Sequence, residues 1–195
     1  QVLTPPLRCL GNICSGPDDI STHVCENKAL VPALGRLLHS EHRHIKKECL
    51  WVLSNLSASA SVSHQIVEHG LMLTIVQLLH STFDIKKESA YTLCNVCSHS
   101  AEICQEVLRQ GALQAMVPLL KLTDMETVYL ALSFTEMMLR NTDNGKVIFE
   151  EAHGLTGLEA LEYHNNTEIR EKTNYILDTY FYQEGTLSPV GSPPT

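Results

Sequence analysis

A period of 40 residues constrains this chain more than any other feature, because a repeated segment implies a repeated unit of structure. Residues 45–56 (Ile-Lys-Lys-Glu-Cys-Leu-Trp-Val-Leu-Ser-Asn-Leu) and 85–96 (Ile-Lys-Lys-Glu-Ser-Ala-Tyr-Thr-Leu-Cys-Asn-Val) align without a gap. A partial copy precedes them at residues 7–13, and a decayed copy follows at residues 125–136. Single units of this length cannot bury their apolar faces alone, whereas stacked neighbours form one continuous core. We therefore expect a stack of similar units.

Each unit is predicted to contain three helices. The first, residues 63–69, ends before Gly70, and Gly111 and Gly154 occupy equivalent positions. Glycine adopts the left-handed conformation that caps a helix at the lowest cost. The next ten residues are strongly apolar and form the second helix, and residues 84–97 form the third, with apolar side chains on one face. Three helices in about 40 to 47 residues indicate armadillo repeats.

The predicted fold is therefore all-α, an armadillo-repeat solenoid that winds as a right-handed superhelix over residues 1–183. It would contain the third helix of one repeat, to about residue 15, and then repeats near 18–58, 61–99, 100–141 and 143–183. Residues 184–195 are rich in Pro, Gly and Ser and are predicted to be a disordered tail. The chain begins at Gln1 without an initiator methionine, so we expect it to be a fragment of a longer protein.

The net charge limits the partners that the chain can bind, and hydropathy and cysteine content limit where the protein is expected to be found. Fourteen basic against 22 acidic residues give a net charge of −8, which opposes a nucleic-acid backbone and favours a basic partner. The longest apolar stretch, residues 71–79, is about half of the roughly 20 residues that a membrane-spanning helix needs, so we expect no membrane span. The seven cysteines lie within helical patterns and not at disulfide-framework spacings, which indicates reduced thiols in the cytosol or nucleus.

One constellation on the third helices is a candidate binding site. In each of three third helices an aromatic or cationic residue precedes an asparagine by four positions, which places both on one helix face. The pairs, which we call the ladder, are Arg8 with Asn12, Trp51 with Asn55, and Tyr91 with Asn95. Neighbouring rungs would lie about 10 Å apart if the helices pack at normal distance, and this spacing suits an extended peptide.

The chemistry of the ladder favours a basic peptide. A carboxamide donates and accepts hydrogen bonds at the same time, so the asparagines can hold a peptide backbone without reading its sequence. The rings form slots for the aliphatic stems of Lys or Arg and attract their charges by cation–π interaction. Glu48 and Glu88, on the same helices, would add charge complementarity.

Two structural alternatives compete with this interpretation. A single tryptophan such as Trp51 more often belongs to a core, and an asparagine at a helix edge can be a local hydrogen-bonding group. Packing does not require the same four-residue spacing in register across three repeats, and this recurrence favours the groove.

Other chemistry is disfavoured. Cys94 and Cys97 form a C-x-x-C pair with Cys104 nearby, but they fall late in an amphipathic helix, where buried packing is the better interpretation than a zinc or redox site. His39, His42 and His44 are expected in a solvated turn and not at a metal. Neither a phosphate-binding glycine loop nor a nucleophile elbow is present, so we expect no enzyme activity and no cofactor.

Several segments carry a family resemblance. Residues 47–55 and 87–95 look like the Lys-Glu-Ala-x-Trp-x-x-x-Asn helices of importin-α, the nuclear-import adaptor. Residues 7–13 are similar to its sixth repeat, where arginine replaces the usual tryptophan, and residues 150–155 resemble its final repeat. The resemblance covers roughly residues 5–183 in collinear order.

The resemblance implies a site and a set of partners. The ladder with Glu48 and Glu88 would be the minor groove for nuclear-localisation signals, formed by repeats six to eight, and the ligands would be basic cargo proteins. The parent protein would also bind importin-β and, through repeats nine and ten, an export receptor, and it would move between cytoplasm and nucleus. The major groove and the autoinhibitory basic arm of the family would lie before Gln1.

This chain also departs from the family. Tyr91 stands where the family has tryptophan, and Ala131 and Thr135 are predicted to occupy the two groove positions of the ninth repeat, where the ladder would end. Cysteine and histidine are unusually frequent, which indicates a divergent member. An armadillo scaffold that binds other proteins without a transport role is the alternative function.

Overall fold

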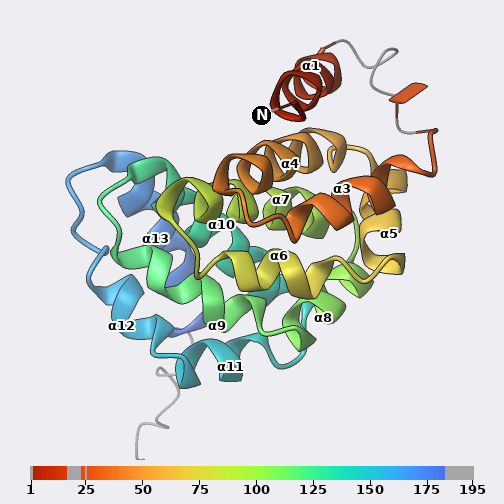
Figure 1. Cartoon of the computed structure of the whole chain (residues 1–195). Coiled ribbons are helices and arrows are strands. Elements are labelled where there is room, and N and C mark those ends of the chain that lie inside the picture. The colour runs from red at the N-terminus through yellow and green to blue at the C-terminus, as the bar shows by residue number, and fades with distance from the viewer. Residues whose placement is uncertain (1, 17–22, 25, 183–195) are drawn as a thin grey trace, which may run out of the picture.

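The computed structural model describes residues 2–16, 23–24 and 26–182, and these contain helices and turns but no strand (Figure 1). The elements are α1 (Thr4–Cys14), α3 (Leu30–Leu38), α4 (Arg43–Leu56), α5 (Ala60–Glu68), α6 (Met72–Leu78), α7 (Phe83–Cys97), α8 (Ala101–Arg109), α9 (Ala112–Met116), the 3₁₀ helix η1 (Val117–Lys121), α10 (Met125–Asn141), α11 (Gly145–Glu151), α12 (Gly154–Glu159) and α13 (Thr167–Tyr180). None of these helices combines the length and hydropathy needed to cross a membrane. The predicted tail and most of the segment that would open the repeat at residue 18 lie outside the described residues.

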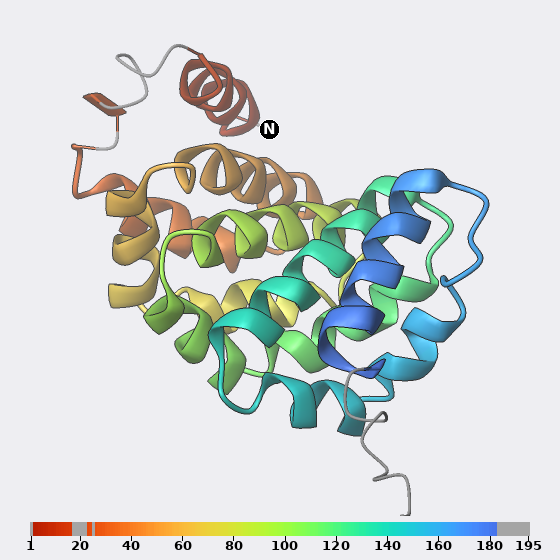
Figure 2. The same ribbon diagram turned by 180° about the vertical axis from the view of Figure 1, so that it is seen from behind.

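The five longer helices form one layer. Helices α1, α4, α7, α10 and α13 pack side by side in chain order, and Figure 2 shows α4 to α13 across the front of the molecule. The shorter helices lie behind and beside this layer, with α3 against α4, α6 against α7, and α9 and η1 against α10. The all-α prediction and the long third helix of each unit are therefore confirmed.

The repeated sequence positions form the core. Ile45 and Ile85 begin the two aligned segments and are both buried, and so are Leu53 and Leu93 eight residues later. These side chains belong to one cluster of buried apolar residues that continues through Phe134 of α10. The hydrophobic core therefore runs along the stack without a break, as expected of a repeat protein.

The predicted glycine caps are confirmed at two of three positions. Gly70 and Gly111 follow α5 and α8 with φ angles of 67° and 79°, the left-handed conformation that favours glycine. The prediction for Gly154 is wrong, because the left-handed residue there is His153, with φ 59°. Gly154 instead begins α12 and lies against Phe149, whose ring would be 2.4 Å from a Cβ atom at residue 154.

The spacing of the third helices corrects the predicted register. Helices α4, α7, α10 and α13 follow the N-cap residues His42, Thr82, Asp124 and Asn166, so the first interval is 40 residues and each of the next two is 42. Asp124 and Asn166 fix the later starts, because their side chains accept hydrogen bonds from backbone amides in the first turn.

This longer interval moves the groove positions of α10. Ala131 and Thr135 were predicted to occupy them, but both are fully buried in the core. Counted from the N-cap, the residues of α10 that match Tyr91 and Asn95 are Ser133 and Met137, which are half-buried. The assignment of Ala131 and Thr135 to the groove is therefore wrong.

Candidate functional site

The six ladder residues lie on three neighbouring helices of the layer, α1, α4 and α7. Arg8 and Asn12 are exposed, whereas Trp51 and Tyr91, like the asparagines that follow each by four residues, are half-buried. The first rung and Trp51 of the second rung share a pocket with a volume of about 310 Å³, lined by Arg8, Asn12, Lys47, Glu48, Trp51 and Glu88. We call it the Trp51 pocket; Asn55, Tyr91 and Asn95 do not line it.

The Trp51 side chain packs against α1 and is also partly exposed. Its ring reaches α1 and lies on Gly11, where a Cβ atom would be 2.2 Å from Cζ3 of the indole, so no larger residue fits without a shift. The same ring lines the Trp51 pocket and is only half-buried. The indole therefore fixes α4 against α1 and also offers surface to a ligand.

The ladder asparagines connect adjacent third helices. Asn55 Nδ2 donates to the carbonyl oxygen of Gly11 at 3.2 Å, and Asn95 Nδ2 donates to that of Ser54 at 2.8 Å. Each amide thus bonds to the preceding third helix, which is the structural alternative considered above. One Nδ2 hydrogen is used in each contact, which leaves the second hydrogen and Oδ1 for a ligand.

Arg8 and Glu48 form an ion pair across the first two helices. Arg8 Nε donates to Glu48 Oε1 at 2.8 Å. The Glu48 side chain is 9% exposed, whereas that of Arg8 is 64% exposed. The charge of Glu48 is therefore covered by Arg8, and it would reach a ligand directly only if the Arg8 side chain moved.

Glu88 is the less engaged carboxylate of the Trp51 pocket. Burial raises the pKa of the Glu88 carboxyl above its usual value; Lys47 and Lys87 act to lower it, and Glu48 and Glu126 act to raise it. A carboxylate that is destabilised by burial and by neighbouring anions gains when a cation approaches. Glu88 is therefore the residue best placed to attract a basic side chain into the pocket.

Tyr91 is held from the next helix. Its hydroxyl donates to Glu126 Oε1 on α10, and Lys87 on its own helix pairs with Glu126 and, at 3.2 Å, with Asp124. The third rung is therefore part of a polar network between α7 and α10, a contact that sequence reasoning did not predict.

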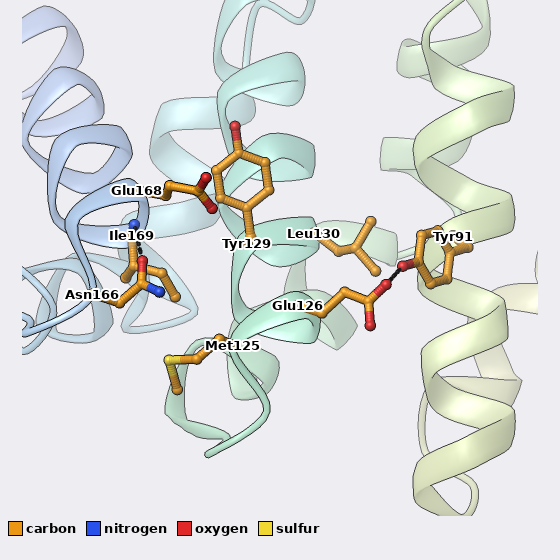
Figure 3. A pocket seen from close by; sticks show the side chains of 8 residues that line it. All are labelled: Tyr91, Met125, Glu126, Tyr129, Leu130, Asn166, Glu168 and Ile169. Carbon is orange, nitrogen blue, oxygen red and sulfur yellow. Dashed lines mark hydrogen bonds between the residues drawn. The ribbon is translucent and has the colours of Figure 1, made fainter.

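This network borders a second pocket that sequence reasoning missed. It has a volume of about 370 Å³ and is lined by Tyr91, Met125, Glu126, Tyr129, Leu130, Asn166, Glu168 and Ile169 of α7, α10 and the start of α13 (Figure 3). We call it the Tyr129 pocket. The available signal was Asp124, a favoured N-cap residue, which sets the correct start of α10 and aligns Tyr129 with Lys87 of α7.

The cysteines and histidines that the structure describes show no metal-binding arrangement. Cys94 and Cys97 lie in the last turns of α7, and burial raises the pKa of the Cys94 thiol to about 12. Cys104 Sγ donates to the carbonyl oxygen of Cys97 at 3.2 Å. The rings of His42 and His44 are exposed and stack 5.6 Å apart. Across the described residues, His, Cys, Asp and Glu form no group of three or more that could hold a metal ion.

Comparisons with known proteins agree with this architecture. The Armadillo/beta-catenin-like repeat family matches residues 28–58. Importin subunit alpha-9 of Arabidopsis thaliana is 35% identical over 94% of this chain and 39% of its own length. Importin subunit alpha-2 of Oryza sativa subsp. japonica is 30% identical over 94% of this chain and 38% of its own length. The chain thus spans about two fifths of these relatives.

A solved structure gives the same result for the fold. A designed armadillo repeat protein in complex with the peptide (KR)4 superposes with a TM-score of 0.81 at 26% identity. The match covers 92% of this chain and 75% of the designed one.

Proposed function

We propose that this chain, an armadillo-repeat solenoid similar to importin-α subunits along 94% of its length, is an adaptor that binds basic localisation-signal peptides. The binding surface is the groove of α1, α4 and α7. The observation that carries the proposal is the Trp51 pocket, where a half-buried indole, an exposed asparagine and the Glu88 carboxyl line one cavity.

The pocket suits a lysine or arginine side chain. The aliphatic stem would lie along the Trp51 ring, and the charge would approach Glu88, whose pKa burial has raised. Asn12 is exposed and would hold the peptide backbone beside the slot. The designed armadillo repeat protein in complex with the peptide (KR)4 supports the same ligand chemistry for this fold.

The role of the whole protein is part of the proposal. Its relatives are importin-α subunits, which supports cargo delivery to the nucleus, partnership with importin-β and an export receptor, and movement between cytoplasm and nucleus. Binding of a peptide, with no chemical step, is the only activity that the groove residues need to perform.

A scaffold without a transport role is the second candidate, and one observation favours it. Arg8, Asn55 and Tyr91 each make a contact within the molecule, to Glu48, Gly11 and Glu126. A groove whose polar groups satisfy one another is less open to a peptide, and partners would then bind other surfaces.

Titration of a fluorescein-labelled (KR)4 peptide separates these candidates. We expect Trp51→Ala to lower affinity roughly two- to thirtyfold, since a cation–π contact contributes about 0.5–2 kcal/mol. Asn12→Ala should also lower it, whereas Asn144→Ala, an exposed asparagine before α11, should not. Equal affinity of wild type, Trp51→Ala and Asn12→Ala would overturn the groove and favour the scaffold.

A further inference from the structure

The Tyr129 pocket lies outside the ladder and has its own chemistry. Figure 3 shows Tyr91 with Glu126 on the α7 side, and Tyr129 with Glu168 on the α13 side. Leu130 lies between them on α10, and Ile169 contributes from the first turns of α13. The pocket thus combines two aromatic rings, two carboxylates and an apolar floor.

The sequence of α10 differs from its neighbours where the pocket forms. Counted from the N-caps, Lys47 of α4 and Lys87 of α7 correspond to Tyr129 of α10. Tyrosine at this position removes a positive charge that would repel a basic ligand, and Tyr129 is 41% exposed, so part of it is open to a ligand. The position of Glu48 and Glu88 is likewise taken by Leu130, which supplies an apolar surface instead of a second buried charge.

The two carboxylates of the pocket are engaged differently. Glu126 already pairs with Lys87 and accepts from the Tyr91 hydroxyl. Glu168 is exposed, and within the described part of the chain it forms neither an ion pair nor a side-chain hydrogen bond. An incoming cation would therefore find one unpaired carboxylate beside an aromatic ring.

We infer that the Tyr129 pocket receives a lysine or arginine side chain of an extended basic peptide that continues beyond the ladder. The aliphatic stem lies on Leu130 and Ile169, and the charged group lies between the Tyr129 ring and Glu168. This inference rests on the proposed function, because the same peptide occupies both pockets.

The distance between the Trp51 pocket and the Tyr129 pocket suits a single extended peptide. Helices α4 and α10 are two positions apart in the layer, which corresponds to about 16–20 Å at normal helix packing. An extended chain advances about 3.3 Å per residue, so five or six residues connect the Trp51 pocket to the Tyr129 pocket. A peptide of about 12 residues spans both with residues to spare.

The test is the affinity of a labelled (KR)6 peptide for four proteins. These are wild type, the pocket variant Tyr129→Ala/Glu168→Gln, the ladder variant Trp51→Ala, and the control Tyr163→Ala/Glu151→Gln. The control removes a tyrosine and a carboxylate that are also exposed but line neither pocket. We expect the pocket variant to bind three- to tenfold more weakly and the control to bind like wild type.

The outcomes separate the two proposals. Weaker binding by the ladder variant together with unchanged binding by the pocket variant would overturn this inference and leave the proposed function intact. Weaker binding by the pocket variant alone would overturn the ladder, and with it the inference that one peptide occupies both pockets. Unchanged binding by the ladder variant and the pocket variant would overturn the proposed function and this inference. A loss of affinity in the control equal to that in the pocket variant would overturn the inference.

A second measurement does not depend on the loss of affinity. Trp51 is the only tryptophan, so the variant Trp51→Phe/Tyr129→Trp has its single indole at the Tyr129 pocket. Addition of (KR)6 should change the emission of this indole in a saturable way. Binding of the labelled peptide without such a change would overturn the inference.

Discussion

Gly11 of α1 positions both members of the second rung, because the Trp51 ring lies on its backbone and Asn55 donates to its carbonyl oxygen at 3.2 Å. A side chain at residue 11 would occupy the space of the indole. One small residue thus aligns the ring and the amide that follows it by one helical turn on α4.

Replacement of this glycine should damage the groove without removing a groove side chain. In Gly11→Ala, the new Cβ would meet Trp51 at 2.2 Å, so the ring must move out of its slot. We expect a shift in Trp51 emission and severalfold weaker binding of (KR)4, measured by fluorescence and by anisotropy of the labelled peptide. Cys9→Ala, an exposed position on the same helix, is the control. Identical emission and affinity in Gly11→Ala and wild type would contradict this arrangement.

Stability measurements should distinguish the asparagines. Asn95 donates to the carbonyl of Ser54 at 2.8 Å and is half-buried, so Asn95→Ala should lower the free energy of unfolding by about 1 kcal/mol. Asn12 is exposed, and its side chain makes no hydrogen bond to another described residue, so Asn12→Ala should leave stability unchanged within about 0.5 kcal/mol. Urea unfolding of both variants provides the check, and equal losses would show that the amide contact contributes nothing.

The repeated segments explain how far sequence reasoning reaches. The aligned copies at residues 45–56 and 85–96 give the correct helices and buried faces, because the same apolar spacing packs in the same way twice. The copy on α10 misled the assignment, since the N-cap of α10 follows that of α7 by 42 residues and not by the 40 residues that separate the N-caps of α4 and α7. Ala131 and Thr135 were placed in the groove for this reason.

Contacts between helices were harder to predict than the helices themselves. Asn55 and Asn95 were recognised as a repeated pattern, but their hydrogen bonds to the preceding helix depend on how closely two helices pack. The Tyr129 pocket depends on three helices at once and on the start of α13. No local sequence pattern records such a distance.

Peptide affinity should depend on pH through Glu88. Because burial raises the pKa of this carboxyl, it becomes neutral at a higher pH than an ordinary glutamate, despite the opposing effect of Lys47 and Lys87. A neutral carboxyl no longer attracts a basic side chain, so the affinity for (KR)4 should fall as pH decreases from 7.5 towards 5. Glu88→Gln should bind more weakly at pH 7.5 and lose part of this dependence. Parallel pH profiles of affinity for wild type and Glu88→Gln would contradict the role of Glu88 in this pH dependence.

The turn before α12 should gain stability from a glycine at residue 153 and lose stability when the glycine at residue 154 is replaced. His153 has φ 59°, which is costly for a residue with a side chain, so His153→Gly should raise the free energy of unfolding by about 1 kcal/mol. That change corresponds to a melting temperature roughly 2–4 °C higher for a chain of this size. Gly154→Ala should be destabilising, because the added Cβ would lie 2.4 Å from the Phe149 ring. Thermal unfolding of both variants tests these two predictions. Lower stability of His153→Gly than of wild type would contradict backbone strain at His153.

The most direct test of the central claim uses Trp51 as its own reporter. It is the only tryptophan and lines the first pocket of the groove, so its emission reports occupancy of that pocket. Titration with (KR)4 should change the emission saturably, with the same midpoint as anisotropy of the labelled peptide, and a neutral (GS)4 peptide should have no effect. Binding of (KR)4 that leaves Trp51 emission unchanged, or no binding at all, would contradict the claim that this groove holds a basic peptide.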